Sequence, residues 1–347
     1  MTKTFYSLFL RIRKGPVKTA VQYKMEIVKN LRDVSKEQAL NSYNELKAIQ
    51  CADIDLTLSR IGTKALDYFF FQHRIKAKTK RHISFYEILS MPDKVAHLNK
   101  LVEQYKKTKI KGLTRTELLR HQYGVFQLYY GTINQFRPMV AKWLYCTLKP
   151  QTGILDFSAG WGGRCLAAMS LGIPYIGVDS NTKMKSAYHN MIKTYDPKAP
   201  VKMIFQPSET VNFSKFQYDL IFTSPPYFKL EEYEKMPDYS SKQDFLDRFF
   251  IPVVLAAWAG LKPKGHMALN MPAEMYDAVK SFLPRLKKSY VLPLINRHPA
   301  AAARRVTLNS RSKGHKELIY VWQKSARQTR KQKQPKKSAT TRKHRPQ

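Results

Sequence analysis

The sequence predicts an α/β fold with a mostly parallel, doubly wound sheet, preceded by a mainly helical N-terminal region. Short apolar runs alternate with helical patterns in the second half of the chain, which is typical of βα units. A glycine-rich turn joins one of these runs to a helix, as at the ligand-binding edge of such sheets. Before residue 115 the apolar residues instead recur at i, i+3 and i+4, as on one face of a helix.

The helical signals come first along the chain. Apolar residues at helical spacing predict helices over 25–31, 39–49 and 95–105. Between them, residues 67–89 interleave aromatic rings with basic side chains. Such a segment is either a helical core with a solvated basic face or a nucleic-acid surface, where rings stack on bases and cations follow phosphates. The sequence leaves both interpretations open.

The alternating region begins at about residue 116. An aromatic, loop-like segment starts at residue 121 and runs into a helix from Pro138. Apolar runs predict strands over 153–157, 175–179, 201–205, 218–223, 265–271, 290–295 and 317–322. The helices predicted between them lie over 163–172, 183–195 and 245–261. Ligands of such folds bind at the carboxyl edge of the sheet, so functional residues are expected there.

Charge is the strongest global signal. The 347 residues carry a formal net charge of +36, which favours a polyanionic partner; nucleic acid is the first expectation and an anionic membrane surface the poorer one. Residues 324–347 hold ten Lys or Arg and no acid, so a disordered basic tail is predicted. The predicted organisation is a helical basic region over 1–115, able to contact nucleic acid, an α/β domain over 116–323, and the tail over 324–347.

Cysteine and hydropathy patterns limit the class of protein. Cys51, Cys146 and Cys165 form neither a disulfide framework nor a zinc spacing, and the nine histidines show no ligand spacing. No apolar stretch approaches the roughly 18 residues of a membrane span, and the first residues lack the order of a signal peptide. The sequence predicts a soluble intracellular protein without a metal site, cytoplasmic or, in a eukaryotic host, nuclear.

The first chemical motif is the stretch ILDFSAGWGG. A predicted strand ends at Asp156, and Gly160 and Gly162 turn the chain into a helix; glycine allows a sharp bend and close contact with a ligand. Asp179 ends the next strand, where an acid can accept ribose hydroxyls. Cys165 stands where the dinucleotide fingerprint requires glycine, and no phosphate-loop Gly-Lys follows. The predicted ligand has a ribose but no pyrophosphate, which fits S-adenosylmethionine.

The second motif is the tetrapeptide Ser224-Pro225-Pro226-Tyr227, directly after the predicted strand 218–223. The prolines fix φ and lack N–H groups, so carbonyls near Ser224 remain free to accept hydrogen bonds. An exocyclic amino group of a base offers such hydrogens, and Tyr227 offers a flat face for stacking. The tetrapeptide is therefore predicted to orient an amine nitrogen toward an electrophile, with proximity and alignment supplying most of the catalysis.

Together these motifs resemble those of the S-adenosylmethionine-dependent amino-methyltransferases of DNA, which form N4-methylcytosine or N6-methyladenine. The resemblance covers about 132–323 and implies a Rossmann-like methyltransferase fold. LDFSAGWGG is similar to the family's cofactor turn, although Phe157 and Ser158 replace its Pro-Phe, and SPPY matches its catalytic motif. The implied catalytic residues are Ser224, Pro225, Pro226 and Tyr227. The implied cofactor-binding residues are Phe136, Arg137, Pro138, Asp156, Ser158, Gly160, Gly162, Asp179 and Ser208. Ser208, followed by Glu209, departs from the family's usual acid against the adenine.

The resemblance also implies the reaction. The amino nitrogen attacks the methyl group directly; the absence of a Pro-Cys pair agrees, because C5-cytosine methylation needs a cysteine nucleophile. In the resembled family SPPY favours N4 of cytosine over N6 of adenine. A duplex base must be flipped out to be reached, so residues that grip the DNA are expected. The candidates are Phe228, directly after the motif, and a basic loop with Arg304, Arg305, Arg311 and Lys313, which could equally be a solvated hairpin.

Two other functional hypotheses are compatible with the sequence. An RNA base methyltransferase explains the net charge of +36 as well as a DNA enzyme does, whereas a protein-amide substrate explains it poorly. A catalytically dead, nucleic-acid-binding methyltransferase fold would show damaged motifs. Asp179, both turn glycines and the SPPY tetrapeptide are intact, which favours an active enzyme.

Overall fold

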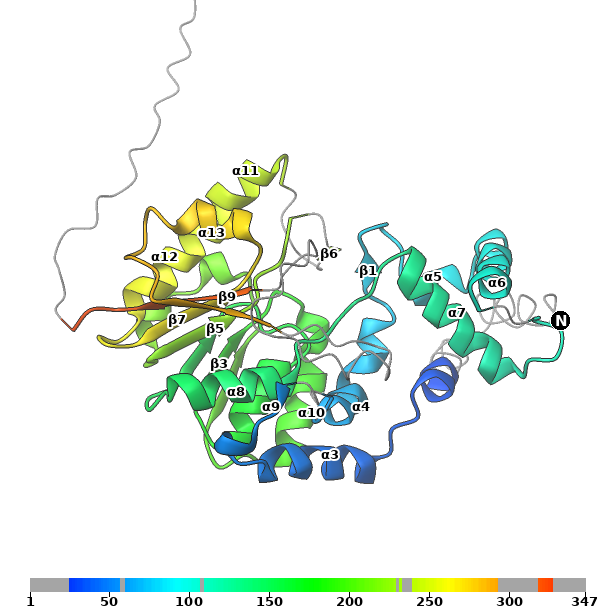
Figure 1. The fold of residues 1–347 in the computed structure, drawn as a ribbon, viewed down its shortest axis with the longest axis horizontal. Helices are drawn as coiled ribbons and strands as arrows, with labels where there is room; N and C mark the ends of the chain where they lie inside the picture. Colours follow the sequence, from blue (N-terminus) through cyan, green and yellow to red (C-terminus); the bar gives the residue numbers. More distant parts are fainter. Residues whose placement is uncertain are drawn as a thin grey trace, which may run out of the picture.

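The computed structural model describes residues 25–56, 60–106, 109–228, 231–232, 239–292 and 318–326. A seven-stranded sheet lies at its centre with helices on both faces, and a group of helices extends to one side (Figure 1). The predicted fold class is thereby confirmed: a mostly parallel, doubly wound, Rossmann-like sheet that follows a helical N-terminal region.

The strand order is β4-β3-β2-β5-β7-β9-β8. The first five strands in this order are parallel, whereas β9 is antiparallel to both β7 and β8. The strands span Ile154–Asp156 (β2), Tyr175–Val178 (β3), Val201–Ile204 (β4), Leu220–Thr223 (β5), His266–Asn270 (β7), Lys288–Val291 (β8) and Leu318–Gln323 (β9). The chain steps outward from β2 to β4 and then returns to β5, so the order reverses between β2 and β5, where such sheets bind ligands.

Both faces of the sheet are buried. Leu220 and Phe222 of β5 pack under one helical layer, and Ile221 between them packs under the other, so the strand is a continuous apolar run rather than an alternating one. The first layer contains α8 (Pro138–Leu148), α9 (Gly163–Leu171) and α10 (Lys185–Tyr195). The second contains α11 (Lys242–Phe245), the π-helical turn η6 (Leu246–Phe250), α12 (Ile251–Gly260) and α13 (Ala273–Val279) (Figure 1). Three short 3-10 turns, η3 (Thr182–Met184), η4 (Ser208–Thr210) and η5 (Phe213–Lys215), lie in the connections.

The N-terminal helices belong to two different cores. A helix covers 25–31, and α3 (Lys36–Ala48) and α4 (Thr63–Arg74) follow it. Leu46 and Phe70 of α3 and α4 join the core above the sheet, whereas Phe71 faces a separate helical core. That separate core lies among α5 (Phe85–Ile88), α6 (Pro92–Lys106) and α7 (Arg115–Tyr129). The adjacent rings of α4 therefore connect the two parts of the molecule.

One detail of the N-terminal half differs from the sequence prediction, and a second bears on the two interpretations that the sequence left open for residues 67–89. The segment from residue 121 is not loop-like: it continues α7, which Thr114 and Glu117 start with a reciprocal capping box. The rings at 69–71 and 85 are buried core residues, while Lys76, Lys78, Lys80 and Arg81 are exposed. The aromatic and basic residues of 67–89 are thus divided between interior and surface.

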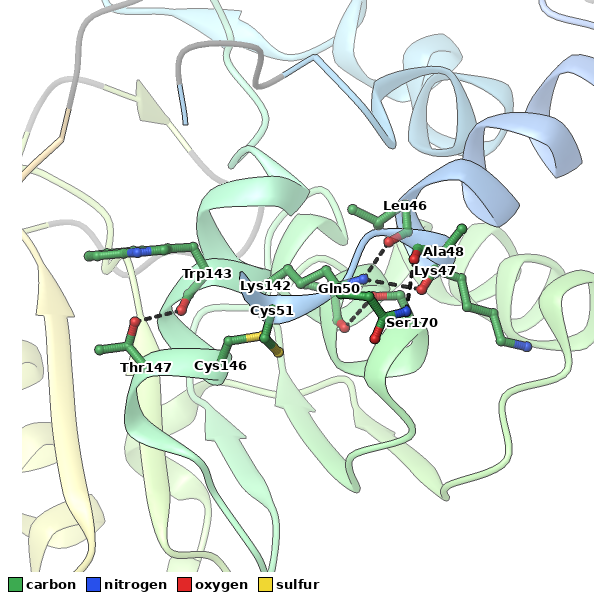
Figure 2. The surroundings of a disulfide bond; sticks show 11 residues. Leu46, Lys47, Ala48, Gln50, Cys51, Lys142, Trp143, Cys146, Thr147 and Ser170 are labelled. Atoms are coloured by element: carbon green, nitrogen blue, oxygen red, sulfur yellow. Dashed lines mark hydrogen bonds between the residues drawn. A yellow bond between two sulfur atoms is a disulfide. The ribbon is translucent and has the colours of Figure 1, made fainter. Parts of the chain in front are cut away.

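A disulfide and a buried lysine tie the end of α3 to α8 (Figure 2). Cys51, in the 3-10 turn η1 (Cys51–Asp53), pairs with Cys146 of α8, 95 residues away; the prediction that the cysteines form no disulfide is wrong, because the fold alone brings these two together. Lys142 Nζ donates to the carbonyls of Leu46 and Lys47. Burial lowers the pKa of Lys142 to about 8.

Among the helices of the described segments, none combines the length and the apolar composition that a membrane span needs.

Candidate active site

The turn after β2 contains glycines in backbone conformations that favour glycine. Gly160 and Gly162 have φ values of +60° and +79°, a region that residues with a Cβ rarely adopt. Gly163 is needed for space, because a Cβ there would lie 2.0 Å from the carbonyl oxygen of Phe136. The segment around Phe136, which the sequence nominated as the cofactor-covering segment, therefore lies directly against the turn.

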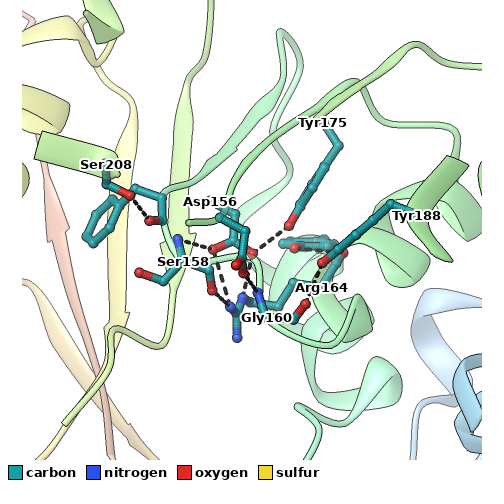
Figure 3. Close-up of polar contacts among 10 residues, drawn as sticks. Asp156, Ser158, Gly160, Arg164, Tyr175, Tyr188 and Ser208 are labelled. Atoms are coloured by element: carbon teal, nitrogen blue, oxygen red, sulfur yellow. Dashed lines mark hydrogen bonds and ion pairs between the residues drawn. The ribbon is translucent and has the colours of Figure 1, made fainter. Parts of the chain in front are cut away.

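A buried ion pair holds the turn from below (Figure 3). Arg164, on the first turn of α9, donates to Asp156 from Nε at 2.7 Å and from Nη2 at 3.3 Å, and Nη2 also donates to the Ser158 carbonyl. The Tyr175 hydroxyl and the Ser158 N–H donate to the same carboxylate. Burial acts to lower the pKa of Arg164, but the Asp156 carboxylate and Tyr175 outweigh it and raise that pKa above its ordinary value. Asp156 thus shapes the turn from beneath.

Asp179 links the end of β3 to the same turn. Its Oδ2 accepts from Gly160 N–H at 2.7 Å, and its Oδ1 accepts from Asn181 N–H at 2.8 Å. Burial raises the pKa of Asp179 to about 6, although both backbone donors act to lower it. Each carboxylate oxygen has a further lone pair, so the ribose role that the sequence nominated is compatible with this geometry. On the other side, the Tyr188 hydroxyl donates to the Gly160 carbonyl at 2.9 Å.

The SPPY tetrapeptide stands at the end of β5, the strand next to β2. Ile154 and Leu155 pair in register with Leu220 and Ile221, so the two motif-bearing strand ends are neighbours. The Tyr227 hydroxyl donates to the backbone carbonyl of Asn270 at 3.3 Å, which ties the motif to the end of β7.

Beyond the motif, the chain packs down onto the second helical layer and then forms a small ribbon. The Phe228 ring lies 6.0 Å from the Phe245 ring, centroid to centroid. Residues Glu231–Glu232 form β6, which pairs antiparallel with β1 (Lys78–Thr79) of the N-terminal half. The acidic stretch after the motif therefore contributes backbone pairing to the helical region.

Several buried polar atoms near this edge have no partner within the part of the chain that the structure describes. They are Thr223 Oγ1 at the end of β5, Asn270 Oδ1 at the end of β7, and both amide atoms of Gln135, next to Phe136. Asn270 Nδ2 does have a partner, the Leu318 carbonyl at 3.0 Å. A buried polar atom without a partner is costly, and a bound molecule commonly supplies the missing partner. These atoms lie at the ends of β5 and β7 and in the segment against the glycine turn, where the sequence predicts the cofactor and the amine, so the residues present fit a bound S-adenosylmethionine.

The remaining nominated residues lie as follows. Ser208, in η4, donates its hydroxyl to the Phe157 carbonyl (Figure 3), so it fixes the connection after β4 against the end of β2. Arg137 is the N-cap residue of α8, and Pro138 occupies its first turn. Four nominated nucleic-acid contacts, Arg304, Arg305, Arg311 and Lys313, lie outside the described residues, as does most of the predicted tail. Among the described residues no cluster of His, Cys, Asp or Glu could hold a metal ion.

Sequence reasoning missed three residues that the structure brings to this edge: Arg164, Tyr175 and Asn270. Arg164 had a signal, because it directly follows the double glycine. Tyr175 and Asn270 had none, because each is an ordinary strand residue whose side-chain partner comes from another strand.

The comparisons with known proteins identify the class. Residues 151–323, about half of the chain, match the model of the family described as RNA cap guanine-N2 methyltransferase. No curated protein sequence matches the chain. Among solved structures, TrmN from Thermus thermophilus is similar at 14% identity, covering 72% of this chain and 80% of that one, with a TM-score of 0.38. A tRNA m1G37 methyltransferase from M. jannaschii is similar at 10% identity, covering 55% of this chain and 51% of that one, with a TM-score of 0.36.

The expectation of a DNA amino-methyltransferase acting on N4 of cytosine or N6 of adenine is therefore wrong, because the family that matches is named for guanine N2 in an RNA cap. The reason lies in the motif itself. SPPY is predicted to hold an exocyclic amino group, which guanine carries at N2 just as cytosine and adenine carry theirs, and that prediction does not involve the sugar. The chemistry survives the correction: the chain is an S-adenosylmethionine-dependent methyltransferase.

Proposed function

We propose that this S-adenosylmethionine-dependent methyltransferase methylates the exocyclic N2 of a guanine in RNA, with a capped RNA end as its substrate. One observation carries the proposal. The SPPY tetrapeptide ends β5 beside the glycine turn that ends β2, and both lie inside the segment that matches the RNA cap guanine-N2 family. An RNA substrate also suits the net charge of +36.

On the cofactor side, S-adenosylmethionine supplies the electrophilic methyl group. In this proposal Asp179 accepts the ribose hydroxyls with the lone pairs that Gly160 and Asn181 leave unused. The turn backbone at Gly160 contacts the methionine part, because the space beside its Cα is open on the side where a Cβ would stand. Phe136 covers the turn, where its ring also lies 5.1 Å from the Arg164 guanidinium.

On the substrate side, the carbonyls near Ser224 and Pro225 accept the two N2 hydrogens, and Tyr227 stacks on the base. These contacts direct the nitrogen lone pair at the methyl carbon, so that alignment supplies much of the rate. The N–C bond would form as the C–S bond breaks, the neutral thioether S-adenosylhomocysteine would leave with the sulfur electron pair, and the excess proton on the nitrogen would pass to water. The acceptors without partners, Asn270 Oδ1 and Thr223 Oγ1, suit guanine, whose N1–H and N2–H groups are adjacent donors.

The test is methyl transfer from labelled S-adenosylmethionine to three substrates in parallel: capped RNA, uncapped RNA of the same sequence, and duplex DNA. Products are digested to nucleosides and separated. We expect label in N2-methylguanosine from capped RNA, and none with the Tyr227→Ala variant under the same conditions. Label in any other nucleoside, or equal labelling of capped and uncapped RNA, contradicts the proposed base or the proposed end specificity, respectively.

A further inference from the structure

We infer that the helical N-terminal half contains a second RNA-binding site, separate from the catalytic edge. The site is an open pocket of about 480 Å³ lined by Arg81, Asp93, Lys94, His97, Tyr129 and Tyr130. These residues come from the loop after β1, the first turns of α6, and the end of α7. The site is proposed to hold one unpaired nucleotide of an RNA strand, with its base on the exposed part of the Tyr129 ring and its phosphate on the cations. The choice of RNA rests on the proposed function.

The side chains of the pocket form a layered arrangement. The Tyr130 ring is almost fully buried at 4% exposure and forms the floor, whereas Tyr129 is 38% exposed. The His97 ring meets Tyr129 edge to face at a centroid distance of 5.1 Å. The Arg81 guanidinium lies 4.4 Å from the Tyr129 centroid and 5.8 Å from that of Tyr130. Unpaired RNA bases stack on both aromatic rings and guanidinium planes.

The contact with Tyr129 also matters for phosphate binding. An arginine on a solvated loop normally loses side-chain entropy when it binds an anion. Arg81 already lies against Tyr129 and Tyr130. Its side chain therefore loses less conformational entropy when its guanidinium N–H donors bind a phosphate. Lys94 adds a second cation on the pocket wall, and Asp93 is the one acid that lines it.

A track of cations leads from this pocket toward the catalytic motif. Lys76, Lys78 and Lys80 alternate along the chain just before Arg81, and all are exposed. Lys78 lies in β1, whose backbone pairs with Glu232 of β6, five residues beyond Tyr227. In Figure 1 this ribbon lies between the sheet and the α5–α7 helices. An RNA strand that follows the cations from the pocket would therefore reach the segment that leaves the SPPY motif.

The surrounding charge favours a polyanion over other ligands. Residues 61–130 contain 14 Lys or Arg and five Asp or Glu. An acidic peptide would satisfy the cations but would leave the exposed Tyr129 face without a stacking partner, whereas a nucleotide uses both features. We therefore propose RNA, and an acidic peptide is an outcome of the test.

The test measures binding of a fluorescent oligouridine to the full-length protein by anisotropy, without S-adenosylmethionine. Tyr129→Ala is expected to weaken binding about 5- to 100-fold, since loss of one base stack costs that much. The matched control is Tyr105→Ala, which removes a ring of α6 that is 64% exposed and does not line the pocket; it should change affinity less than about twofold. Arg81→Ala should reduce the slope of log affinity against log salt by about 0.7.

Further variants and readouts keep the outcomes separate. Tyr129→Phe should retain binding, and Lys94→Glu should weaken it without a change in melting temperature, which distinguishes lost contacts from unfolding.

Oligouridine contains no guanine, so its binding does not depend on N2 methylation. If Tyr129→Ala weakens oligouridine binding while capped RNA is never methylated, the pocket stands and the proposed function fails. If capped RNA is methylated but Tyr129→Ala binds oligouridine as Tyr105→Ala does, the pocket proposal is overturned. Binding of a polyglutamate peptide in place of oligouridine would overturn it as well.

Discussion

The end of β2 and the ends of β5 and β7 lie at the same edge of one sheet, but their polar groups are in opposite states. At the end of β2 the Asp156 carboxylate accepts from Arg164, Tyr175 and the Ser158 backbone. At the ends of β5 and β7, Thr223 Oγ1 and Asn270 Oδ1 are buried without a partner among the described residues. Among the described residues, the carboxylate at the end of β2 is fully engaged by protein donors, whereas Thr223 Oγ1 and Asn270 Oδ1 at the other two strand ends are not.

The difference separates two tasks. A turn that wraps a cofactor benefits from being rigid before binding, because ordering it afterwards would weaken affinity. A site that must recognise a base needs acceptors left unsatisfied until the correct donors arrive, and rejects a base that cannot satisfy them. On this view the β2 end is a preformed cofactor cradle and the β5–β7 end selects the substrate. Substitutions at the end of β2 should therefore affect stability, and substitutions at the ends of β5 and β7 should affect turnover.

The largest stability effect is expected for Arg164→Ala. It leaves the Asp156 carboxylate charged and buried without its cation, which should lower the free energy of unfolding by about 3–5 kcal/mol. Urea denaturation measures the change. The control is Arg248→Ala, which breaks an exposed pair with Asp244 whose arginine is 56% exposed and should cost less than about 1 kcal/mol. Equal losses from both variants would mean that the β2 end is not a rigid cradle.

At the β5 end we expect the largest catalytic effect from Tyr227→Ala. Loss of the stacking ring should reduce kcat/KM at least about 100-fold, or about 2.7 kcal/mol, while S-adenosylmethionine binds as in the wild type by calorimetry. Pro225→Ala should act in the same direction. Tyr227→Phe keeps the ring and loses the hydrogen bond to the Asn270 carbonyl, so it should retain most activity. A parallel loss of cofactor affinity in Tyr227→Ala would assign the motif to the cradle instead.

Two buried asparagines provide a sharper comparison. Asn270→Ala removes an acceptor without a partner, so it should lower kcat/KM roughly tenfold, since each such contact is worth about 1–2 kcal/mol. It also removes the Nδ2 donor to the Leu318 carbonyl, but that carbonyl still accepts from Met271 N–H, so the melting temperature should fall less than in Asn99→Ala. Asn99 in the helical core already accepts from Gln122 at 2.7 Å. Asn99→Ala should therefore leave Gln122 buried without its partner and lower the melting temperature, while kcat/KM stays unchanged. The same pattern in both variants would refute a substrate role for Asn270.

The smallest effect concerns pH. Burial raises the pKa of Asp179 to about 6, and its ionised form is the better acceptor for ribose hydroxyls. Affinity for S-adenosylmethionine should therefore be constant above about pH 7 and fall as pH drops through 6, by at most about tenfold per pH unit. Calorimetry between pH 5 and 8 measures the profile. Asp179→Asn should bind more weakly at neutral pH and lose this dependence; an unchanged profile would show that Asp179 does not contact the cofactor.

Much of this site could be predicted from the sequence because its signals are local. The strand before Asp156, the glycines that bend the chain, and the rigid SPPY exit from β5 each depend on residues adjacent in the chain. Backbone sterics and apolar runs act over a few residues, so pattern alone located the glycine turn after β2 and the rigid tetrapeptide after β5, and predicted a cofactor role for the first and an amine-binding role for the second. It also indicated the amine chemistry, though not the polymer that carries the amine, since no local feature of the motif contacts the sugar.

Tertiary structure decided which distant groups meet. Tyr175 reaches Asp156 from a neighbouring strand, Asn270 adjoins Tyr227 from another, and Cys51 meets Cys146 across 95 residues. The pairing of β1 with β6 likewise joins segments about 150 residues apart. Such contacts depend on sheet order and register, which the whole chain determines through the burial of both faces of the sheet. The sequence by itself therefore determined the elements and their chemical groups, and only the folded chain decided which of those groups are satisfied and which remain open to a ligand.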